Sequence, residues 1–346
     1  MSVFQQPDFD DHEHVAFFSD QAAGLKCVIA VHNTNLGPAL GGLRIWPYAD
    51  EDAALTDALR LSRGMTYKSA LAGLSLGGGK AVVIADPRRD KTEDLLRAFG
   101  RAVDRLAGKY ITAEDVGSTV ADLQTVRRET EFVAGIPDSG GEDPSSATAY
   151  GVYRGIKAAA RHVFGSDSLY GLTVALQGAG NVGRHLAELL HEAKANLIVA
   201  DINPAAVADL VQRFGATAIS TDKIHMTCAE VFAPCALGAS LNDQTIPELR
   251  ARIVAGSANN QLAEARHGAM LREHGILYAP DYAINAGGVI NIAHEGPGYD
   301  RQAAFAHVGR IQDTLAQIFE LSDREGIATS AAADRLAEDR FMTKAA

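Results

Sequence analysis

A glycine-rich turn between a strand and a helix is the feature that most constrains the fold of this chain. Residues 172–176 are apolar and predict a buried strand, residues 177–183 contain the pattern Gly-x-Gly-x-x-Gly, and residues 184–193 have helical spacing. The next apolar run, residues 197–201, ends in an aspartate. A strand, a glycine turn, a helix and a second strand with a terminal acid are typical of a βαβ unit that binds a dinucleotide.

Each glycine of this turn has a separate physical role. The first permits a tight turn, the second lets a pyrophosphate approach the backbone, and the third lets the helix pack closely on the strand. The phosphates then meet the N–H groups at the start of the helix. The residues predicted to contact the cofactor here are Gly178, Ala179, Gly180, Asn181, Val182 and Gly183.

Asp201, at the end of the second strand, predicts which dinucleotide binds. Its carboxylate can accept hydrogen bonds from the ribose hydroxyls and would repel a 2′-phosphate, so it favours NAD over NADP. The alternative is a Rossmann-like domain that binds no dinucleotide.

The length of the chain predicts two domains. It has 346 residues, and a single hydrophobic core rarely grows beyond about 250–300 residues. Residues 135–146 are rich in glycine, proline and serine and form the best linker. We therefore expect an α/β protein with a first α/β domain over residues 1–140 and a doubly wound Rossmann domain over residues 141–325. Helices are predicted over residues 262–273 and, as one long helix, over residues 301–324.

The charge of the chain excludes some classes of partner. The formal net charge is −11 and no long tract of lysine and arginine offsets it, so we expect no binding to nucleic acid or to anionic membranes. No apolar run reaches the roughly 18–20 residues that span a bilayer, and the first residues lack the apolar core of a signal peptide. Cys27, Cys228 and Cys235 have no CxxC spacing, which predicts reduced thiols in the cytoplasm and no metal site.

Two lysines stand in a stretch that is otherwise small or apolar. A helix that starts after Asp50 carries Lys68 near its C-terminal end, and Lys80 leads into an apolar strand over residues 81–85. A lysine in an apolar cleft tends to lose its proton near neutral pH, and two close lysines lower each other's pKa, which suits acid–base chemistry. The alternative is a surface loop with two solvated lysines.

Glycines are concentrated in two segments near these lysines. Residues 35–44 predict a glycine-rich loop that re-enters a strand at residues 45–46. Residues 77–79, directly before Lys80, are three consecutive glycines, which would let the backbone approach a ligand closely.

A short strand over residues 110–117 ends in two carboxylates, Glu114 and Asp115. Either could serve as an acid–base group, and either could simply cap a helix or lie in a loop. Thr119 and Asp122 have the spacing of a capping box, which predicts a further helix.

Taken together, these motifs resemble the Glu/Leu/Phe/Val amino-acid dehydrogenase superfamily, and most closely its leucine dehydrogenases. The resemblance runs from about His14 to about Arg340. Its motifs are residues 36–42, 64–68, 77–80, 112–117, 234–238, 256–261 and 280–288. It implies a first domain that binds the amino acid and makes the contacts of a homo-oligomer, between a dimer and an octamer. It also implies a second domain that binds NAD, and a C-terminal helix, residues 326–346, that returns to the first domain.

The resemblance also assigns roles to individual residues. It implies that Lys68 holds the substrate α-carboxylate, that Lys80 activates the water that attacks an imine, and that Asp115 moves protons to and from the substrate nitrogen. General chemistry agrees, because hydride leaves the α-carbon only when the amine is neutral, and a hydroxide-like nucleophile must then attack the iminium. Further residues that the resemblance places at the substrate or the cofactor are Gly41, Gly42, Thr148, Ala236 and Asn260.

The side-chain pocket of the superfamily falls here on four apolar residues, Leu40, Ala113, Val289 and Ile292. A glutamate side chain would bury its carboxylate there without a cation, which is strongly unfavourable. The implied substrates are therefore leucine, isoleucine and valine, which single methylenes separate by roughly 1–3 kcal/mol each. The alternatives are a phenylalanine, tryptophan or valine specialist on the same scaffold, and a catalytically silent dinucleotide-binding regulatory protein.

Overall fold

The computed structural model describes residues 2–136, 144–236, 238–296 and 298–342, in two compact units. The predicted α/β fold with two domains is confirmed. The predicted boundary after residue 140 lies outside the described residues, so the predicted domain limits stay a prediction. Unit 1 contains Met1–Glu142, Ile292–Tyr299 and Ala337–Ala346, and unit 2 contains Asp143–Asn291 and Asp300–Leu336.

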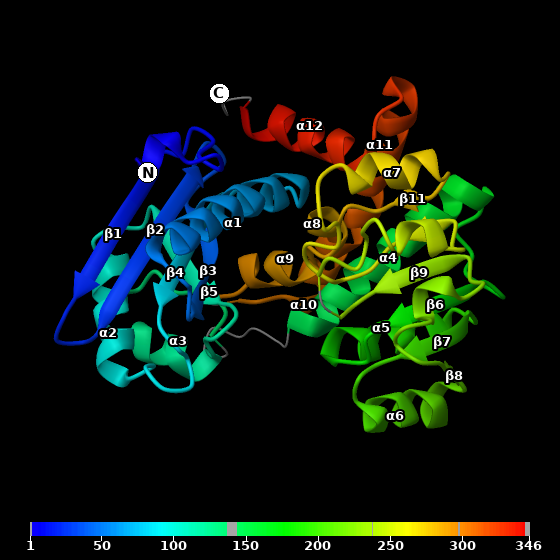
Figure 1. The fold of residues 1–346 in the computed structure, drawn as a ribbon, viewed down its shortest axis with the longest axis horizontal. Coiled ribbons are helices and arrows are strands. Elements are labelled where there is room, and N and C mark those ends of the chain that lie inside the picture. Colours follow the sequence, from blue (N-terminus) through cyan, green and yellow to red (C-terminus); the bar gives the residue numbers. More distant parts are fainter. Residues whose placement is uncertain (1, 137–143, 237, 297, 343–346) are drawn as a thin grey trace. The chain divides into compact units, whose positions relative to one another are not determined.

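Unit 1 is built on a mixed five-stranded sheet in the order β1-β2-β4-β3-β5. β2 pairs antiparallel with β1 and with β4, whereas β3 is parallel to both β4 and β5. The strands are β1 (His14–Asp20), β2 (Leu25–Asn33), β3 (Ala39–Trp46), β4 (Gly77–Ile84) and β5 (Tyr110–Glu114). Helix α1 (Glu51–Leu71) covers one face, and α2 (Glu93–Asp104) with α3 (Val120–Val126) covers the other (Figure 1).

The helices of unit 1 start where their sequences predict. The Asp50 side chain accepts a hydrogen bond from the Ala53 N–H at 2.8 Å and begins α1, whose last turn carries Lys68. The capping box of α3 is present, because Thr119 and Asp122 each bond the backbone N–H of the other. Both helices bury an apolar face on the sheet.

Much of the two glycine-rich segments lies within strands. The predicted loop over residues 35–44 is wrong from Ala39 onward, because β3 begins there. The three glycines before Lys80 lie within β4, which therefore starts earlier than the strand predicted over residues 81–85. Glycine is typical of turns, and a pattern read along the chain cannot distinguish a turn from a tightly packed strand.

Close packing explains why these strands contain glycine. A Cβ atom at Gly41 would overlap the carbonyl oxygen of Gly79 on the neighbouring strand. A Cβ atom at Gly78 would overlap the backbone nitrogen of Thr66 on α1. The glycines therefore let β3, β4 and α1 approach one another. The predicted approach of this backbone to a ligand stays a prediction.

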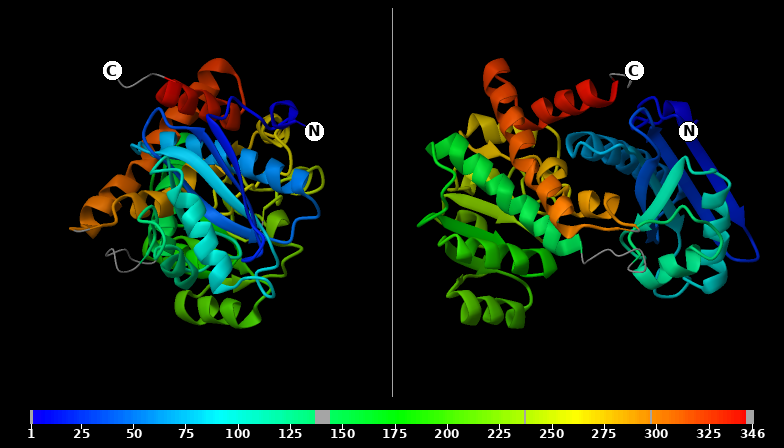
Figure 2. Two further views of the ribbon diagram at one scale, coloured as in Figure 1. Left: turned by 90° about the vertical axis from the view of Figure 1, so that its left-hand side faces the viewer. Right: turned by 180° about the vertical axis from the view of Figure 1, so that it is seen from behind.

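Unit 2 has a parallel sheet, as the βαβ pattern predicts, and its strands are drawn mainly in green in Figure 2. In the described residues the sheet has six strands in the order β11-β10-β9-β6-β7-β8. The strands are β6 (Thr173–Gln177), β7 (Asn196–Ala200), β8 (Thr217–Ala218), β9 (Val231–Pro234), β10 (Ile253–Val254) and β11 (Leu277–Tyr278). The remaining helices, of which α9 and α12 extend into unit 1, are α4 (Pro144–Phe164), α5 (Asn181–Glu192), α6 (Pro204–Phe214), α7 (His267–Glu273), α8 (Asp281–Ile284), α9 (Gly287–Ala293), α10 (Arg301–Gly309), α11 (Ile311–Glu325) and α12 (Thr329–Met342). No helix within the described ranges is long and apolar enough to cross a membrane.

Two helices of unit 2 differ from their predicted limits. The single helix predicted over residues 301–324 is wrong, because α10 ends at Gly309 and α11 begins at Ile311. Glycine is less favourable than alanine inside a helix by about 1 kcal/mol, so an interruption at this point costs little. The helix predicted over residues 262–273 starts only at His267, whose Nδ1 accepts a hydrogen bond from the Glu264 N–H at 2.9 Å.

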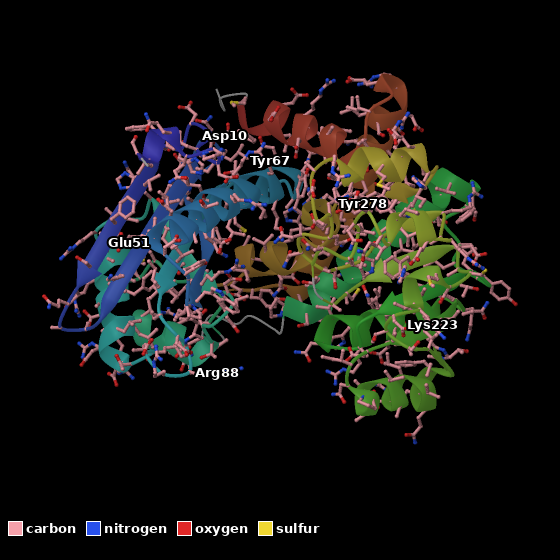
Figure 3. All side chains as sticks on the ribbon, in the orientation of Figure 1. Asp10, Glu51, Tyr67, Arg88, Lys223 and Tyr278 are labelled. Atoms are coloured by element: carbon pink, nitrogen blue, oxygen red, sulfur yellow. The ribbon has the colours of Figure 1, made fainter. Side chains whose placement is uncertain are left out.

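The last turns of α12 pack on α1 within unit 1. Arg340 Nη1 donates to the carbonyl oxygens of Ala70 and Leu71 at 3.1 and 2.8 Å, at the end of α1. The rings of Phe341 and Tyr67 meet edge to face with their centroids 5.3 Å apart. Figure 3 labels Tyr67 on α1. The last turns of α12 therefore stabilise α1, the helix that carries Lys68.

Two histidines are buried in unit 1 beside α1. His12 Nε2 lies 3.1 Å from Ser62 Oγ, and its Nδ1 accepts a hydrogen bond from the Asp10 N–H at 3.1 Å (Asp10 is labelled in Figure 3). His32 Nδ1 lies 2.9 Å from Thr66 Oγ1, and the two imidazole rings are 4.9 Å apart. The sequence pattern had singled out neither histidine.

Candidate active site

The strand register of unit 1 places a lysine on the face of the sheet that α1 covers. Side chains alternate between the two faces along a strand, and Leu43 on β3 and Ala81 on β4 belong to the core on the α2 face. Leu40 on β3 and Lys80 on β4 therefore point to the α1 face, where both are buried. Ala113, near the end of β5, is buried as well.

Lys80 and Asp115 form a buried ion pair. Lys80 Nζ lies 2.6 Å from Asp115 Oδ2, and Lys80 is only 5% exposed. The Asp115 N–H donates to Ser118 Oγ at 3.0 Å, and Ser118 Oγ donates to the Leu43 carbonyl oxygen at 2.8 Å. These bonds fix the turn after β5 to β3. Asp115, rather than Glu114, is thus the carboxylate whose contact with Lys80 defines the cluster.

A third charged side chain, Arg44 of β3, completes the cluster. Its Nε donates to Asp115 Oδ2 at 3.0 Å, and its Nη1 donates to Asp57 Oδ2 on α1 at 3.0 Å. The hydroxyl of Tyr48 donates to the same oxygen of Asp57. Arg44 had no role in the sequence prediction. The signal that could have identified Arg44 is a cationic residue between two apolar residues of one buried strand.

Burial and charge together set the protonation of this cluster. Burial lowers the pKa of Lys80; Asp115 opposes this effect and Arg44 adds to it, so that the pKa is lowered overall. Burial raises the pKa of Asp115, but the charges of Lys80 and Arg44 outweigh burial and hold the pKa below its usual value. The predicted lowering of the Lys80 pKa is present, and burial is its largest cause.

Other residues predicted at the substrate lie in both units. Lys68 is half-buried in the last turn of α1, and Gly42 is tightly enclosed, since a Cβ atom there would lie 2.6 Å from the Cβ of Asp115. Ile292 belongs to unit 1 and Val289 to unit 2, although both are on α9. The roles of these residues at the substrate stay predictions.

The glycine turn of unit 2 has the geometry that a pyrophosphate requires. Gly178 has a φ of +107°, which L side chains rarely adopt, and a Cβ atom at Gly183 would overlap the Gly178 carbonyl oxygen. A Cβ atom at Gly180 would meet no heavy atom within 4 Å. Gly180 is the N-cap of α5 and supplies no side-chain cap, so the first N–H groups of this helix suit an anion.

Asp201 is bonded to the same turn. Its Oδ2 accepts a hydrogen bond from the Ala179 N–H at 2.6 Å, and its Oδ1 accepts one from the Asn203 N–H at 2.7 Å. Asn181 and Val182 form the first turn of α5, next to the glycines. Together these residues fit a dinucleotide, and its identity as NAD stays a prediction.

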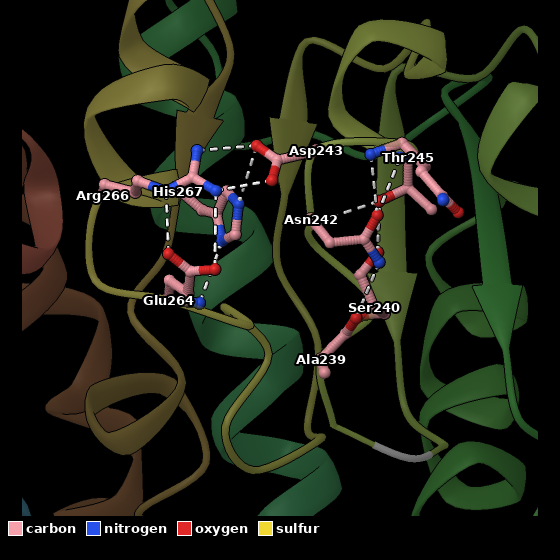
Figure 4. A network of polar contacts seen from close by, with 9 residues as sticks. Ala239, Ser240, Asn242, Asp243, Thr245, Glu264, Arg266 and His267 are labelled. Carbon is pink, nitrogen blue, oxygen red and sulfur yellow. Dashed lines mark hydrogen bonds and ion pairs between the residues drawn. The ribbon is translucent and has the colours of Figure 1, made fainter.

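Asn260 lies in unit 2, where a backbone hydrogen bond ties it to Ala239. It has a φ of +51°, in the left-handed region that asparagine tolerates better than most residues, and its side chain is exposed. Its carbonyl oxygen accepts a hydrogen bond from the Ala239 N–H at 2.7 Å. The neighbouring segment is fixed by Asp243, which contacts Arg266 and His267 (Figure 4). The role predicted for Asn260 at the substrate and the cofactor stays a prediction.

Two further residues predicted at the cofactor also lie in unit 2. The hydroxyl of Thr148 donates to the Pro144 carbonyl oxygen at 2.9 Å, in the first turns of α4. Ala236 is exposed two residues after the end of β9. Their contacts with the cofactor stay predictions.

Two family models match the chain. The model described as "Glu/Leu/Phe/Val dehydrogenase, dimerisation domain" matches residues 12–132. The model described as "Glutamate/Leucine/Phenylalanine/Valine dehydrogenase" matches residues 140–209 and 197–320. The matched residues include both the ion pair of unit 1 and the glycine turn of unit 2.

Named relatives match along nearly the whole chain. Leucine dehydrogenase of Bacillus cereus is 55% identical over 345 residues, which cover 99% of this chain and 94% of that protein. L-tryptophan dehydrogenase of Nostoc punctiforme is 51% identical over 342 residues, covering 99% and 96%. Valine dehydrogenase of Streptomyces albus is 48% identical over 339 residues, covering 96% and 93%.

Solved structures share the fold. The crystal structure of L-tryptophan dehydrogenase from Nostoc punctiforme matches with a TM-score of 0.88 and 49% identity, covering 96% of each chain. A glutamate dehydrogenase from Thermus thermophilus matches with a TM-score of 0.76 and 22% identity, covering 95% of this chain and 88% of that one, which is a likeness of fold alone. Because the family models and the named relatives span both units, the chain belongs to the Glu/Leu/Phe/Val dehydrogenase family and is an L-amino-acid dehydrogenase of the leucine dehydrogenase type.

Proposed function

We propose that this dehydrogenase catalyses the NAD-dependent oxidative deamination of branched-chain aliphatic L-amino acids. One observation carries the proposal: a buried lysine–carboxylate pair, Lys80 and Asp115, in the same unit as the buried apolar residues Leu40 and Ala113. The pair offers acid–base chemistry, and the apolar residues suit an aliphatic side chain. The reaction consumes the amino acid, water and NAD⁺ and gives the 2-oxo acid, ammonium, NADH and a proton.

The residues of unit 1 have separate tasks in this proposal. NAD, when bound, accepts the hydride from the α-carbon. Asp115 takes a proton from the substrate ammonium group, so that the neutral amine can assist hydride loss. Lys80, whose pKa is lowered chiefly by burial, then takes a proton from the water that attacks the iminium carbon. Lys68 holds the α-carboxylate by charge, in the last turn of α1.

The proposed cofactor is NAD, bound at the glycine turn of unit 2. Gly178, Gly180 and Gly183 would hold the pyrophosphate at the start of α5. Asp201 would accept hydrogen bonds from the ribose hydroxyls and repel a 2′-phosphate. The residues that directly follow it, Ile202 and Asn203, offer no cation for such a phosphate.

The proposed substrate preference rests on the apolar pocket residues. Leu40, Ala113, Val289 and Ile292 offer no cation for the side chain of glutamate, whose burial without a partner is unfavourable. A second candidate is an aromatic amino acid, because L-tryptophan dehydrogenase of Nostoc punctiforme is 51% identical to this chain. We further propose a homo-oligomer, supported by the match to a dimerisation domain over residues 12–132.

One assay tests the proposal. NADH formation is measured at alkaline pH with L-leucine, L-isoleucine, L-valine, L-phenylalanine, L-tryptophan and L-glutamate, and with NADP in place of NAD. We expect leucine, isoleucine and valine to be the best substrates and NADP to be poor. An aromatic amino acid as best substrate would overturn the argument from the apolar pocket, and no turnover of any amino acid would overturn the proposed reaction.

A further inference from the structure

One oxygen atom of Asp115 contacts two cations, Lys80 and Arg44, and only Lys80 has a role in the proposed reaction. Oδ2 lies 2.6 Å from Lys80 Nζ and accepts a hydrogen bond from Arg44 Nε at 3.0 Å. The Arg44 side chain is 22% exposed and extends from the middle of the sheet on the α1 face. A charged group is rarely placed there without a partner or a task.

Arg44 is held in place from its other side as well. Its Nη1 donates to Asp57 Oδ2 on α1 at 3.0 Å, and the Tyr48 hydroxyl donates to the same oxygen. The guanidinium is planar, so contacts through two of its nitrogens fix both its position and its orientation. A continuous chain of contacts therefore leads from Tyr48 through Asp57, Arg44 and Asp115 to Lys80.

The charges of this chain have a consequence for a reaction in which Lys80 loses its proton. With Lys80 charged, two cations face two carboxylates, those of Asp115 and Asp57. When Lys80 becomes neutral, Asp115 would be left as an unpaired carboxylate in a largely buried position, which is unfavourable. Arg44 prevents this, because it stays charged at any pH at which the enzyme works.

We propose that Arg44, fixed by Asp57 and Tyr48, is a positioning residue that keeps Asp115 oriented and ionised while Lys80 changes its protonation. The inference rests on the proposed roles of Lys80 and Asp115 in amino-acid oxidation. It assigns to Arg44 no contact with the substrate.

The electrostatics of the cluster agree with this role. Burial lowers the pKa of Arg44, but Asp115 and Asp57 outweigh burial and raise the pKa overall. Arg44 in turn contributes to the lowered pKa of both Lys80 and Asp115. Another charged group of α1, Arg60, lines the same cavity as Arg44 and Asp57.

A cavity beside Arg44 allows a direct test. Its volume is about 530 Å³, and Arg44, Trp46, Tyr48, Asp57, Arg60 and Val116 are among the residues that line it. A small ion can therefore reach the space that the Arg44 side chain would vacate. Guanidinium has the shape and charge of the lost group, whereas urea has only the shape.

The experiment compares single-turnover rates of NADH formation from L-leucine in the wild type and in Arg44→Ala. We expect the rate to fall about 100-fold, the loss that a small misplacement of a catalytic group causes, with little change in KM. Guanidinium chloride at non-denaturing concentration should restore a large part of the rate, and the same concentration of urea should not. Arg44→Lys keeps the charge without bridging two carboxylates and should be intermediate.

The pH profile gives a readout that a merely structural role would not change. The proposed base Lys80 must be neutral, so the rate rises with pH through its pKa. Removing the positive charge of Arg44 raises that pKa, and the rising limb of the profile should move to higher pH. Arg97→Ala serves as the matched control, because Arg97 is also ion-paired, to Glu129 at 2.6 Å, but on α2 at the other face of the sheet.

The possible outcomes separate this inference from the proposed function. A wild type that oxidises no amino acid overturns the proposed function. An active wild type whose Arg44→Ala variant keeps its rate and its pH profile overturns the role of Arg44, as does a loss that guanidinium fails to restore. If Arg44→Ala does not fold, Asp57→Asn keeps the charge of Arg44 but loosens its orientation. An unchanged single-turnover rate in that variant would then overturn the inference.

Discussion

At Lys80, burial and a neighbouring carboxylate act on the same proton in opposite directions. Burial disfavours the ammonium form, whereas Asp115 at 2.6 Å favours it. A lysine in this balance changes its protonation when a charged group arrives nearby. This is the property that a base for the activation of water requires.

The role proposed for Lys80 predicts a selective loss of turnover. Lys80→Ala should lose about 10²–10⁴-fold in turnover, the usual contribution of a general base, while NADH still binds to unit 2. Turnover is measured with L-leucine and NAD, and NADH binding by fluorescence titration. Lys26→Ala is the control, since Lys26 is 66% exposed and pairs with Glu51 at the surface. A Lys80→Ala enzyme as active as this control would exclude the assigned role.

The buried pair His12 and His32 is arranged for neutral imidazoles. His12 Nδ1 accepts from the Asp10 N–H, so its proton is on Nε2, and a second proton on Nδ1 would face that N–H. Burial and His12 lower the pKa of His32 to about 4, although Asp10 opposes this effect. Arg63, which contacts Asp10 at 2.7 Å, adds to the lowering.

Acid should therefore destabilise unit 1 through His32. Its pKa rises from about 4 when folded to 6.5 when unfolded, so the unfolded state binds more protons in this range. The free energy of unfolding should thus fall by up to about 3 kcal/mol as the pH drops from 6.5 to 4. His32→Asn, which can keep the bond to Thr66, should reduce this pH dependence. Denaturant unfolding at several pH values measures it.

The exposed His14 provides the control for this measurement. His14→Asn should leave the acid dependence of unfolding as it is in the wild type, because His14 lies at the surface of β1. An equal pH dependence in the wild type and in His32→Asn would show that other groups, such as the paired carboxylates, cause the acid sensitivity.

Residue roles differ in how far the sequence reveals them. Lys80 and Asp115 are found because each stands in a recognisable local motif. Arg44 and His32 are not, because their partners lie far along the chain: Arg44 meets Asp115 on the turn after β5, and His32 meets Thr66 on α1. Only the register of the sheet and the packing of α1 bring these groups together.

At the level of elements, the contact between β4 and α1 is unusually close. Gly78 faces the backbone of Thr66 with no room for a Cβ atom. This approach holds the end of α1, with Lys68, against the strand that carries Lys80. The spacing of the two predicted lysines is therefore set by backbone packing.

Glycine-to-alanine substitutions at two positions test this contact. Gly78→Ala should lower the free energy of unfolding by about 1–3 kcal/mol or more, because β4 must move away from α1. Gly64→Ala should raise it by about 0.5–1 kcal/mol, since Gly64 is exposed in the same helix and a Cβ atom there meets no heavy atom within 4 Å. Urea unfolding compares them. Equal effects of the two substitutions would contradict the packing argument.

Elements with strong local signals are predicted well, and those set by packing are not. Helix α1 follows from its cap at Asp50 and its apolar spacing, and the βαβ unit follows from its glycine turn. The start of β3 was predicted as a loop and the start of β4 was missed, because the glycines there are explained by a neighbouring strand or helix. The division at Gly309 was missed for a different reason, because one glycine does not by itself end a helix.

For the whole molecule, the two units have separate apolar cores. Phe341 is 1% exposed and contacts the rings of Tyr67 and His32 in unit 1. Phe341→Ala should therefore lower the free energy of unfolding by about 3–5 kcal/mol and reduce turnover. The affinity for NADH, measured by fluorescence titration at low temperature, should stay within twofold of the wild type. A large loss of that affinity would show that unit 2 depends on this contact.

The chain passes between the two units four times, after residues 142, 291, 299 and 336. Exchange of one unit between related enzymes by recombination therefore cannot use a single junction. In a chimera joined only near residue 142, the last segments of unit 1 would come from the other parent. These segments include Arg340 and Phe341, which contact the end of α1. Transfer of substrate preference from one family member to another thus requires three separate stretches to be exchanged together.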